Sequence, residues 1–339
     1  MNCAGGRTPW GTWITCEETV NGPDVFDDFT RGTLPPNTYV QNAQLTKPHG
    51  YIFEVDAYGV GSPEPIRNAG RFAHEAMAYD PYPGYVYLTE DNFGYPSLFY
   101  KYVPPAHPDR AGRLLDGGEL YALAVVGKPN IDLSARYPVG TRFPVTFMKI
   151  EDPDPTFPMS GGLPTVINDD AINYVGAQGR ASGAAYFSRL EGAVYDFNTI
   201  YFCSTQGGGD PEDPDVSVAR SAGYGKGFGQ IWAYHPDRLE LELVYQSPGR
   251  AVLDFPDNVT LTGRGNLVLC EDSTDFNYLR LLSPDGQLRD FAVNQIAGRT
   301  NEEFAGACFS PDFQTMYVNI QASAGLSIAI WGPWETIGA

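Results

Sequence analysis

The chain has 339 residues, of which 42% are hydrophobic and 13% are aromatic, so it is a globular protein and not a disordered one. It carries 41 acidic against 22 basic residues, a net charge of −19. This excludes a nucleic-acid polymer as a partner, because phosphate backbones select basic surfaces. No run reaches the roughly 18 apolar residues of a transmembrane helix, and we recognise no signal peptide in the chain.

Glycine (38 residues) and proline (28 residues) are abundant and spread along the whole chain, which is typical of many short strands joined by tight turns. The five cysteines are scattered and include no C-x-x-C pair. The spacing therefore indicates neither a zinc knuckle nor a disulfide framework.

The first predicted element is the β-prone run at residues 13–15, which leads directly into Cys16, Glu17 and Glu18. The same design recurs downstream, where one apolar run ends in Glu90 and Asp91 and another ends in Cys270, Glu271 and Asp272. Three strands that end in paired acids predict a common acidic centre.

Alternation of apolar and polar residues predicts the other strands. In the first half they lie at residues 51–56, 85–91, 98–103, 120–126 and 147–150, and a helix is expected within 166–180. In the second half they lie at residues 193–195, 199–203, 229–234, 241–245, 267–270, 278–283 and 315–321.

Several of these strands belong to an internal repeat, which consists of a leading acid, a short apolar strand, a turn and a second strand. The leading acids are Glu75, Glu191, Asp257 and Glu303. Asp257 and Glu303 are separated by about the length of one four-stranded blade, ~40–45 residues. We therefore expect an all-β protein, a β-propeller of five or six blades with six favoured. It would be a single domain over residues 1–339, with an irregular insertion at about 104–182.

In a propeller the leading acids would line one mouth of the central channel, where like charges repel unless cations lie among them. The alternative is that each acid caps a turn by accepting backbone N–H groups. Carboxylates together with the amide of Asn258 suit calcium, whereas the thiol of Cys16 beside two glutamates suits a softer ion such as iron. Cys16 and Cys270 could also be ordinary buried core residues.

The sequence offers little support for other kinds of catalytic site. The four histidines do not form a ligand set, and the chain has neither a G-x-S-x-G nor a Walker-type motif.

Several motifs resemble those of the PhoX alkaline phosphatase family, and they occur in the family's order. The longest is residues 2–18, NCAGGRTPWGTWITCEE. The others lie at residues 70–76, 87–91, 189–191, 256–258, 268–272, 303–311, 318–321 and 331–334.

The resemblance implies a propeller phosphomonoesterase that holds iron and calcium on its axis. Cys16 would be the thiolate ligand of iron, and Arg189 would contact the substrate phosphate. Catalysis is thus assigned to Arg189, Cys16 and Glu191. The oxygen ligands of iron and calcium would be Glu17, Glu75, Glu191, Asp257 and Asn258, with Glu18, Glu90, Asp91 and Glu271 as further candidates.

We therefore expect a hydrolase that acts on small phosphate esters, with iron and calcium as cofactors. The family resemblance implies a periplasmic or extracellular location, and we expect a monomer. Two alternatives remain open at this point, a calcium-dependent propeller hydrolase such as a lactonase and a non-catalytic calcium-binding propeller.

Overall fold

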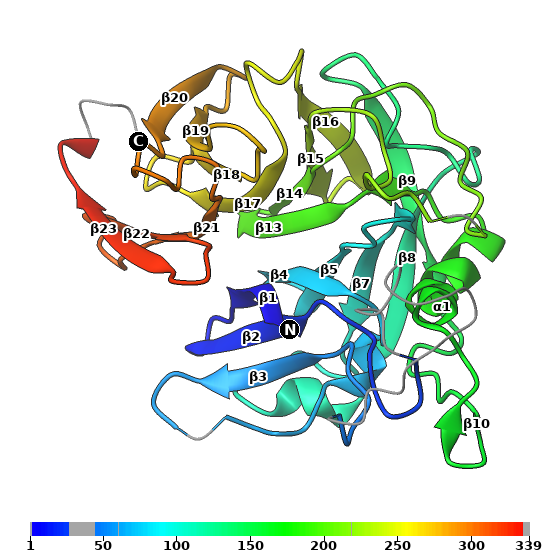
Figure 1. Ribbon diagram of the computed structural model, residues 1–339. Helices are drawn as coiled ribbons and strands as arrows, with labels where there is room; N and C mark the ends of the chain where they lie inside the picture. The colour runs from blue at the N-terminus through cyan, green and yellow to red at the C-terminus, as the bar shows by residue number, and fades with distance from the viewer. Residues whose placement is uncertain (1, 27–44, 60, 218, 335–339) are drawn as a thin grey trace. The chain divides into compact units, whose positions relative to one another are not determined.

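The computed structural model describes residues 2–26, 45–59, 61–217 and 219–334 (Figure 1). These residues form antiparallel β-sheets almost throughout, so the all-β prediction is confirmed. The chain divides into two compact units. The first comprises the described residues of 1–132, 145–186 and 213–224, and the second those of 133–144, 187–212 and 225–334.

The first unit contains two main sheets, β1-β2-β3 and β4-β5-β7-β8, the latter extended by part of β9. The bounds of its strands are β1 Asn2–Arg7, β2 Thr12–Glu17, β3 Ile52–Asp56, β4 His74–Asp80, β5 Tyr85–Glu90, β6 Pro96–Ser97, β7 Phe99–Val103, β8 Glu119–Val125, β9 Arg142–Lys149, β10 Met159–Ser160 and β11 Leu163–Pro164. Its helices are η1 Arg67–Ala69, η2 Arg113–Asp116 and α1 Asn168–Ala181.

The second unit contains three sheets, β13-β14-β15-β16, β17-β18-β19-β20 and β21-β22-β23. The bounds of its strands are β12 Phe187–Ser188, β13 Leu190–Asp196, β14 Thr199–Ser204, β15 Gln230–His235, β16 Glu240–Gln246, β17 Pro256–Leu261, β18 Leu267–Glu271, β19 Tyr278–Leu282, β20 Leu288–Val293, β21 Phe304–Phe309, β22 Thr315–Ile320 and β23 Leu326–Trp331.

Strand β9 belongs to both units. Its first residues, Arg142 to Pro144, pair with β16 in the second unit, whereas Val145 to Lys149 pair with β8 in the first. The segment at 104–182, expected to be an irregular insertion, thus contributes strands β8 and β9, the two-stranded sheet β10-β11 and helix α1.

Every strand predicted above coincides with an observed one to within a few residues, and α1 confirms the helix expected within 166–180. The strands that were not predicted include the two-residue strands β6, β10, β11 and β12 and the longer strands β20 and β23. For β20 and β23 the reason is visible in their burial. Their side chains lie mostly half-buried or exposed, so they lack the apolar alternation that marks a strand with one buried face.

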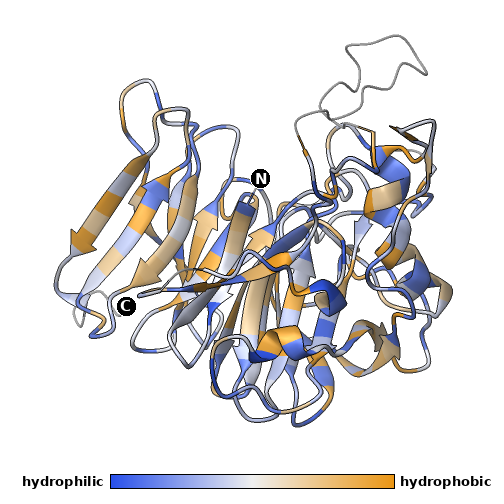
Figure 2. Cartoon of the chain, turned by 90° about the horizontal axis from the view of Figure 1, so that it is seen from below, coloured by the Kyte–Doolittle hydropathy of each residue, from blue (hydrophilic) through white to orange (hydrophobic). Residues whose placement is uncertain are grey.

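Each unit has its own apolar core. The first is built from the inward faces of β2 to β8 and includes Cys16, Phe72, Leu88 and Tyr100, all fully buried. Gly179 of α1 lies directly against Leu98 and Ala122, so the helix covers one face of the β7–β8 region. In Figure 2, hydrophobic and hydrophilic bands alternate along many of the strands, the pattern of a sheet with one buried face.

Among the described residues, no helix has both the length and the apolarity that crossing a lipid bilayer requires.

Candidate metal centre

The first strand of each of the five sheets contains a β-bulge, in which one extra residue interrupts the pairing with the second strand. The register shifts lie between Cys3 and Gly6, His74 and Met77, Leu190 and Ala193, Pro256 and Val259, and Ala305 and Cys308. A bulge bends its strand and turns side chains away from strict alternation. The bulges of β4, β13 and β17 contain predicted ligands, namely Glu75, Glu191 and the pair Asp257–Asn258.

Glycines allow neighbouring bulges to pack closely. A Cβ atom on Gly6 of β1 would lie 2.0 Å from the carbonyl oxygen of Met77 in β4. A Cβ atom on Gly192 of β13 would lie 2.6 Å from the amide nitrogen of Val259 in β17. Both positions therefore require glycine, and the contact brings the acid-bearing bulges within each unit close to one another.

In the first unit, Cys3, Glu18 and Glu75 form a group that we call the Cys3 cluster. One potential ligand atom from each, the Cys3 thiol and two carboxylate oxygens, lies within 4.8 Å of the other two. Glu75 is fully buried, whereas Cys3 and Glu18 are partly exposed. A thiol and two carboxylates at this spacing could all bind a single metal ion.

In the second unit, Asp257, Asp272 and Glu303 form the Asp257 cluster, whose carboxylate oxygens also lie within 4.8 Å of one another. Burial, reinforced by repulsion from Asp257 and Asp272, raises the pKa of Glu303 to about 10. Three acids in one place therefore cannot all be ionised without a compensating cation.

Arg189 lies two residues before Glu191, and its Nη2 donates to Glu191 Oε1 at 2.8 Å. Its side chain is 12% exposed and that of Glu191 is 2% exposed. Its φ of +39° lies in the left-handed region, which is unusual for a residue other than glycine and often marks a functional position. Arg189 also acts electrostatically on Glu303, where it lowers the pKa, so its positive charge lies near the Asp257 cluster.

Cys16, predicted as the iron ligand, lies opposite Cys3 in the β1–β2 ladder but is fully buried in the apolar core of the first unit. Burial, followed by the charge of Glu75, raises the pKa of its thiol well above the usual value. The structure thus brings Cys3 together with Glu18 and Glu75, and the role of Cys16 as an iron ligand stays a prediction.

Three other predicted ligands accept hydrogen bonds from their own surroundings. Glu17 accepts from Gly50 N, Tyr51 N and the ring of His49, contacts that lower its pKa although burial opposes them. Glu90 Oε2 accepts from Leu98 N and Tyr100 Oη.

Glu271 accepts from Asp254 N, Tyr278 N and the guanidinium of Arg280, which lies 2.8 Å away. Burial raises the pKa of Glu271, and Arg280 opposes that rise. Together with Glu17 and Glu90, this residue is held by donors of its own sheet and neighbouring loops.

The remaining predicted ligands are Asp91, just after β5, and Asn258, in the bulge of β17. Asp91 follows β5, is buried, and its backbone N–H donates to Ala73 O. Asn258 follows Asp257 in the bulge of β17 and is partly exposed.

The sequence model of the alkaline phosphatase PhoX family matches residues 1–324. The chain belongs to the PhoX alkaline phosphatase family. As a PhoX-family member it is a hydrolase that acts on phosphate monoesters. No curated protein matches the chain significantly.

The structure of Pseudomonas fluorescens PhoX in complex with vanadate, a transition-state analogue, is similar at a TM-score of 0.64. It shares 20% identity, and the alignment covers 97% of this chain and 68% of that one. This likeness confirms the propeller-like fold class, whereas the number of blades stays a prediction. A periplasmic gluconolactonase of Pseudomonas aeruginosa gives a TM-score of 0.39 at 11% identity, covering 84% of this chain and 76% of that one. A Lactobacillus plantarum protein gives 0.35 at 12% identity, covering 83% and 61%.

Sequence reasoning did not propose Cys3 or Asp272 of this PhoX-family chain as ligands, and it named Glu303 only as a leading acid. Each can be found once the register is known. Cys3 pairs with Cys16 across β1 and β2, and Asp272 follows the last residue of β18, which faces the bulge of β17. For two of the three strand-end pairs, the useful signal was the second acid, Glu18 or Asp272, and not the cysteine beside the pair.

Proposed function

We propose that this PhoX-family chain hydrolyses phosphate monoesters of small alcohols with metal ions bound at the Cys3 cluster and the Asp257 cluster. The observation that carries the proposal is the convergence of Cys3, Glu18 and Glu75 on one point, because a thiol among carboxylates is a metal-ligand set with no obvious structural purpose.

The donor atoms fit the two predicted metals. A thiolate with two carboxylates suits a transition ion, and we assign iron to the Cys3 cluster. The Asp257 cluster offers only oxygen atoms, with the amide of Asn258 adjacent, and we assign calcium to it. A cation there would also remove the repulsion that raises the pKa of Glu303.

Arg189 is the residue that we assign to the substrate phosphate. A guanidinium can donate two parallel hydrogen bonds to phosphate oxygens, and Glu191 fixes its orientation through their ion pair. The left-handed backbone at Arg189 sets the direction in which the side chain leaves the strand. Glu191 therefore acts as a positioning residue in this proposal, and its role as a metal ligand stays a prediction.

Bound cations would supply charge neutralisation of the phosphate and acidification of a water molecule. This chemistry needs no serine or cysteine nucleophile, in agreement with the lack of a G-x-S-x-G motif in the sequence. It also explains how a chain with a net charge of −19 could bind an anion, because the metals reverse the local field.

The family also supports a location in the periplasm or outside the cell, where organic phosphate esters would be the substrates. We retain the monomeric state as a prediction.

The proposal is tested by hydrolysis of p-nitrophenyl phosphate at alkaline pH, with iron and calcium content measured on the same sample. We expect turnover that a calcium chelator abolishes and that added calcium restores. Protein shown to contain both metals but unable to cleave the ester would contradict the proposal.

A matched pair of variants locates the activity. Arg189→Lys keeps the charge but cannot make the bidentate contact, so kcat/KM should fall at least about tenfold. Arg264→Lys, a change of the same kind in the turn before β18, should leave kcat/KM unchanged.

A further inference from the structure

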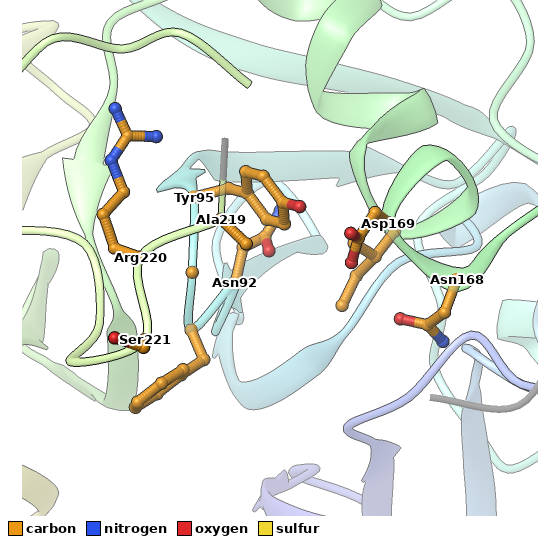
Figure 3. Close-up of a pocket in the computed structure, with 10 residues that line it drawn as sticks. Asn92, Tyr95, Asn168, Asp169, Ala219, Arg220 and Ser221 are labelled. Carbon is orange, nitrogen blue, oxygen red and sulfur yellow. The ribbon is translucent and has the colours of Figure 1, made fainter. Parts of the chain in front are cut away.

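A cavity of about 440 Å³ in the first unit does not identify the phosphate site (Figure 3). Its lining comes from the loop after β5, the first turn of α1 and residues 219–221, and it includes neither Arg189 nor a member of either cluster. The contacts that place Arg189 lie instead in the second unit, in its own sheet and in the next one along the chain.

Four of the sheets share a hydrogen bond at one end of their first two strands. In each of them, the residue directly after the second strand donates its backbone N–H to the carbonyl oxygen of the residue directly before the first strand. The bonds run from Asp91 to Ala73, from Thr205 to Arg189, from Asp272 to Phe255 and from Gln321 to Glu303, with lengths between 2.9 and 3.1 Å. Residues 91, 205, 272 and 321 therefore occupy equivalent positions in their sheets.

Acids occupy this position in the two sheets that supply it to the metal clusters. Glu18 directly follows β2 and belongs to the Cys3 cluster, and Asp272 directly follows β18 and belongs to the Asp257 cluster. In the sheet that carries Arg189 and Glu191 the residue is Thr205, which offers an uncharged hydroxyl group. The contacts of Thr205 show what a threonine does there in place of an acid.

Thr205 is fully buried and joins two neighbouring sheets. Its backbone N–H donates to Arg189 O at 3.0 Å, and its Oγ1 donates to Pro256 O at 2.9 Å. Pro256 is the first residue of β17, directly before Asp257, and β17 lies beside β13 (Figure 1). One residue thus connects the backbone of the arginine assigned to the phosphate with the backbone next to an acid assigned to calcium.

The backbone of Arg189 is held on both sides. The carbonyl of Ser188, in the peptide plane before Arg189, accepts from Ser204 Oγ at 2.6 Å. The carbonyl of Arg189, in the plane after it, accepts from Thr205 N. Because a peptide bond is planar, two fixed planes fix both backbone dihedrals of the residue between them. These two donors therefore hold Arg189 at its left-handed φ of +39°.

The hydroxyl of Thr205 acts in the same way on Asp257. The carbonyl of Pro256 lies in the peptide plane that ends at the nitrogen of Asp257, so the bond from Thr205 holds that plane. Asp257 lies in the bulge of β17, where the pairing with β18 is interrupted. Pro256 is also packed closely, since a Cβ atom on Gly229 would lie 2.3 Å from its Cδ.

A second buried threonine of the same unit shows the ordinary role of such a hydroxyl. Thr262 is 3% exposed, and its Oγ1 accepts from the backbone N–H groups of Arg264 and Asn266 in the turn before β18. It stabilises a local turn, whereas Thr205 bonds to a residue 51 positions away in another sheet.

We propose that Thr205 is a positioning residue that couples Arg189 to the Asp257 cluster. It sets the distance and direction between the strand that carries the phosphate-binding guanidinium and the bulge that carries Asp257. The inference rests on the proposed phosphatase function, in which Arg189 and a bound calcium ion act on the same phosphate group. It adds to that function a residue that acts through Arg189 and Asp257.

The test removes the Thr205 hydroxyl while keeping the size of the side chain. Thr205→Val keeps the N–H bond to Arg189 but leaves Pro256 O without this donor. We expect the Kd of calcium, and the Kd of inorganic phosphate at saturating calcium, each to rise about fivefold, the effect of one lost hydrogen bond. Thr205→Ser restores the hydroxyl and should bring both Kd values back to within about twofold of the wild type. Calorimetric titration of the iron-loaded protein measures both.

Thr262→Val is the matched control, because it also removes a buried threonine hydroxyl from the second unit. It should lower the urea concentration at which the protein unfolds and leave both Kd values unchanged. The same result in Thr205→Val, or a failure of Thr205→Ser to restore binding, would show that the Thr205 hydroxyl is only structural and would overturn the inference.

Two further outcomes keep the inference separate from folding and from the phosphatase assignment. If Thr205→Val does not fold, Thr205→Cys takes its place, and its weaker donor should raise both Kd values at least about twofold. Wild-type Kd values in that variant would overturn the inference. A wild-type protein that binds calcium and phosphate but cleaves no ester would refute the phosphatase function alone, and the Kd values would still decide the role of Thr205.

Discussion

In two of the three strand-end acid pairs, Glu17–Glu18 and Glu271–Asp272, the two members have different environments. Glu17 and Glu271, which end β2 and β18, accept hydrogen bonds from backbone amides and from His49 or Arg280. The next residues, Glu18 and Asp272, lie in the Cys3 cluster and the Asp257 cluster. Successive side chains on a strand point to opposite faces, so adjacent acids cannot share one environment.

The difference shows what a carboxylate at a strand end can do. The first member of each pair is held by donors of its own sheet and nearby loops, so it stabilises the fold. The second member lies beside other acids, and a bound cation would relieve the repulsion between these like charges. Mutations at the two members should therefore have different consequences, one for folding and one for metal binding.

The largest expected difference is between the two cysteines that face each other across β1 and β2. Cys3→Ser should remove the thiolate from the Cys3 cluster and lower the iron content, with a fall of at least about 1,000-fold in phosphatase kcat. Cys16→Ala removes only a buried core side chain and should keep the metal, at a cost of about 1–2 kcal/mol in the free energy of unfolding.

Metal analysis and assay of both variants decide between the two cysteines. Full activity in Cys3→Ser, or loss of iron from a folded Cys16→Ala, would restore the ligand role that the sequence motif implied for Cys16.

The next prediction compares the neighbours Glu271 and Asp272. Glu271→Gln leaves Arg280, which is 4% exposed, with Asp290 as its remaining ionic partner, so the free energy of unfolding should fall by about 2 kcal/mol, the loss of a charged hydrogen bond. Asp272→Asn should instead weaken calcium binding. Without metal, this variant should unfold at the same urea concentration as the wild type or at a slightly higher one, because one of the repelling negative charges has been removed.

Urea unfolding of metal-free protein and calcium titration should be run on both variants. Equal losses of stability in the two would show that Asp272 is a structural acid, and an unaltered calcium affinity in Asp272→Asn would remove it from the proposed ligand set.

The sequence could predict the fold class and nearly all the strands, because apolar alternation and turn residues are local signals. It also identified Glu75, Asp257 and Glu18, since their neighbours form repeated motifs. It could not identify Cys3 as the thiol of the cluster, because this depends on the bulge in β1 and on the contact between Gly6 and Met77, which is 71 positions further along the chain.

The roles of Glu90 and Glu271 were also beyond the sequence. Glu90 is bound to Leu98 and Tyr100, and Glu271 to Arg280, and these contacts follow from how the second strand pairs with the third. The sequence does not show whether an acid at a strand end accepts hydrogen bonds from backbone amides or lies among other acids.

Glu90 tests the same comparison by pH. Burial raises its pKa to about 7, and the hydrogen bond from Leu98 and the charge of Arg180 only partly oppose the rise. Between pH 4.5, near its unfolded pKa, and pH 7 the folded protein keeps a proton that the unfolded chain has released. The free energy of unfolding should therefore fall as the pH rises through this window, and the loss should be constant above pH 7.

The Gln side chain of Glu90→Gln cannot ionise, so the variant should not show this loss of stability. Between pH 4.5 and pH 8 the free energy of unfolding of the wild type should therefore fall by about 3 kcal/mol relative to that of the variant. Urea unfolding of both proteins over this range measures the shift. If the two proteins showed the same dependence of stability on pH, Glu90 would be ionised in the folded protein over the whole range. It would then again be a candidate metal ligand.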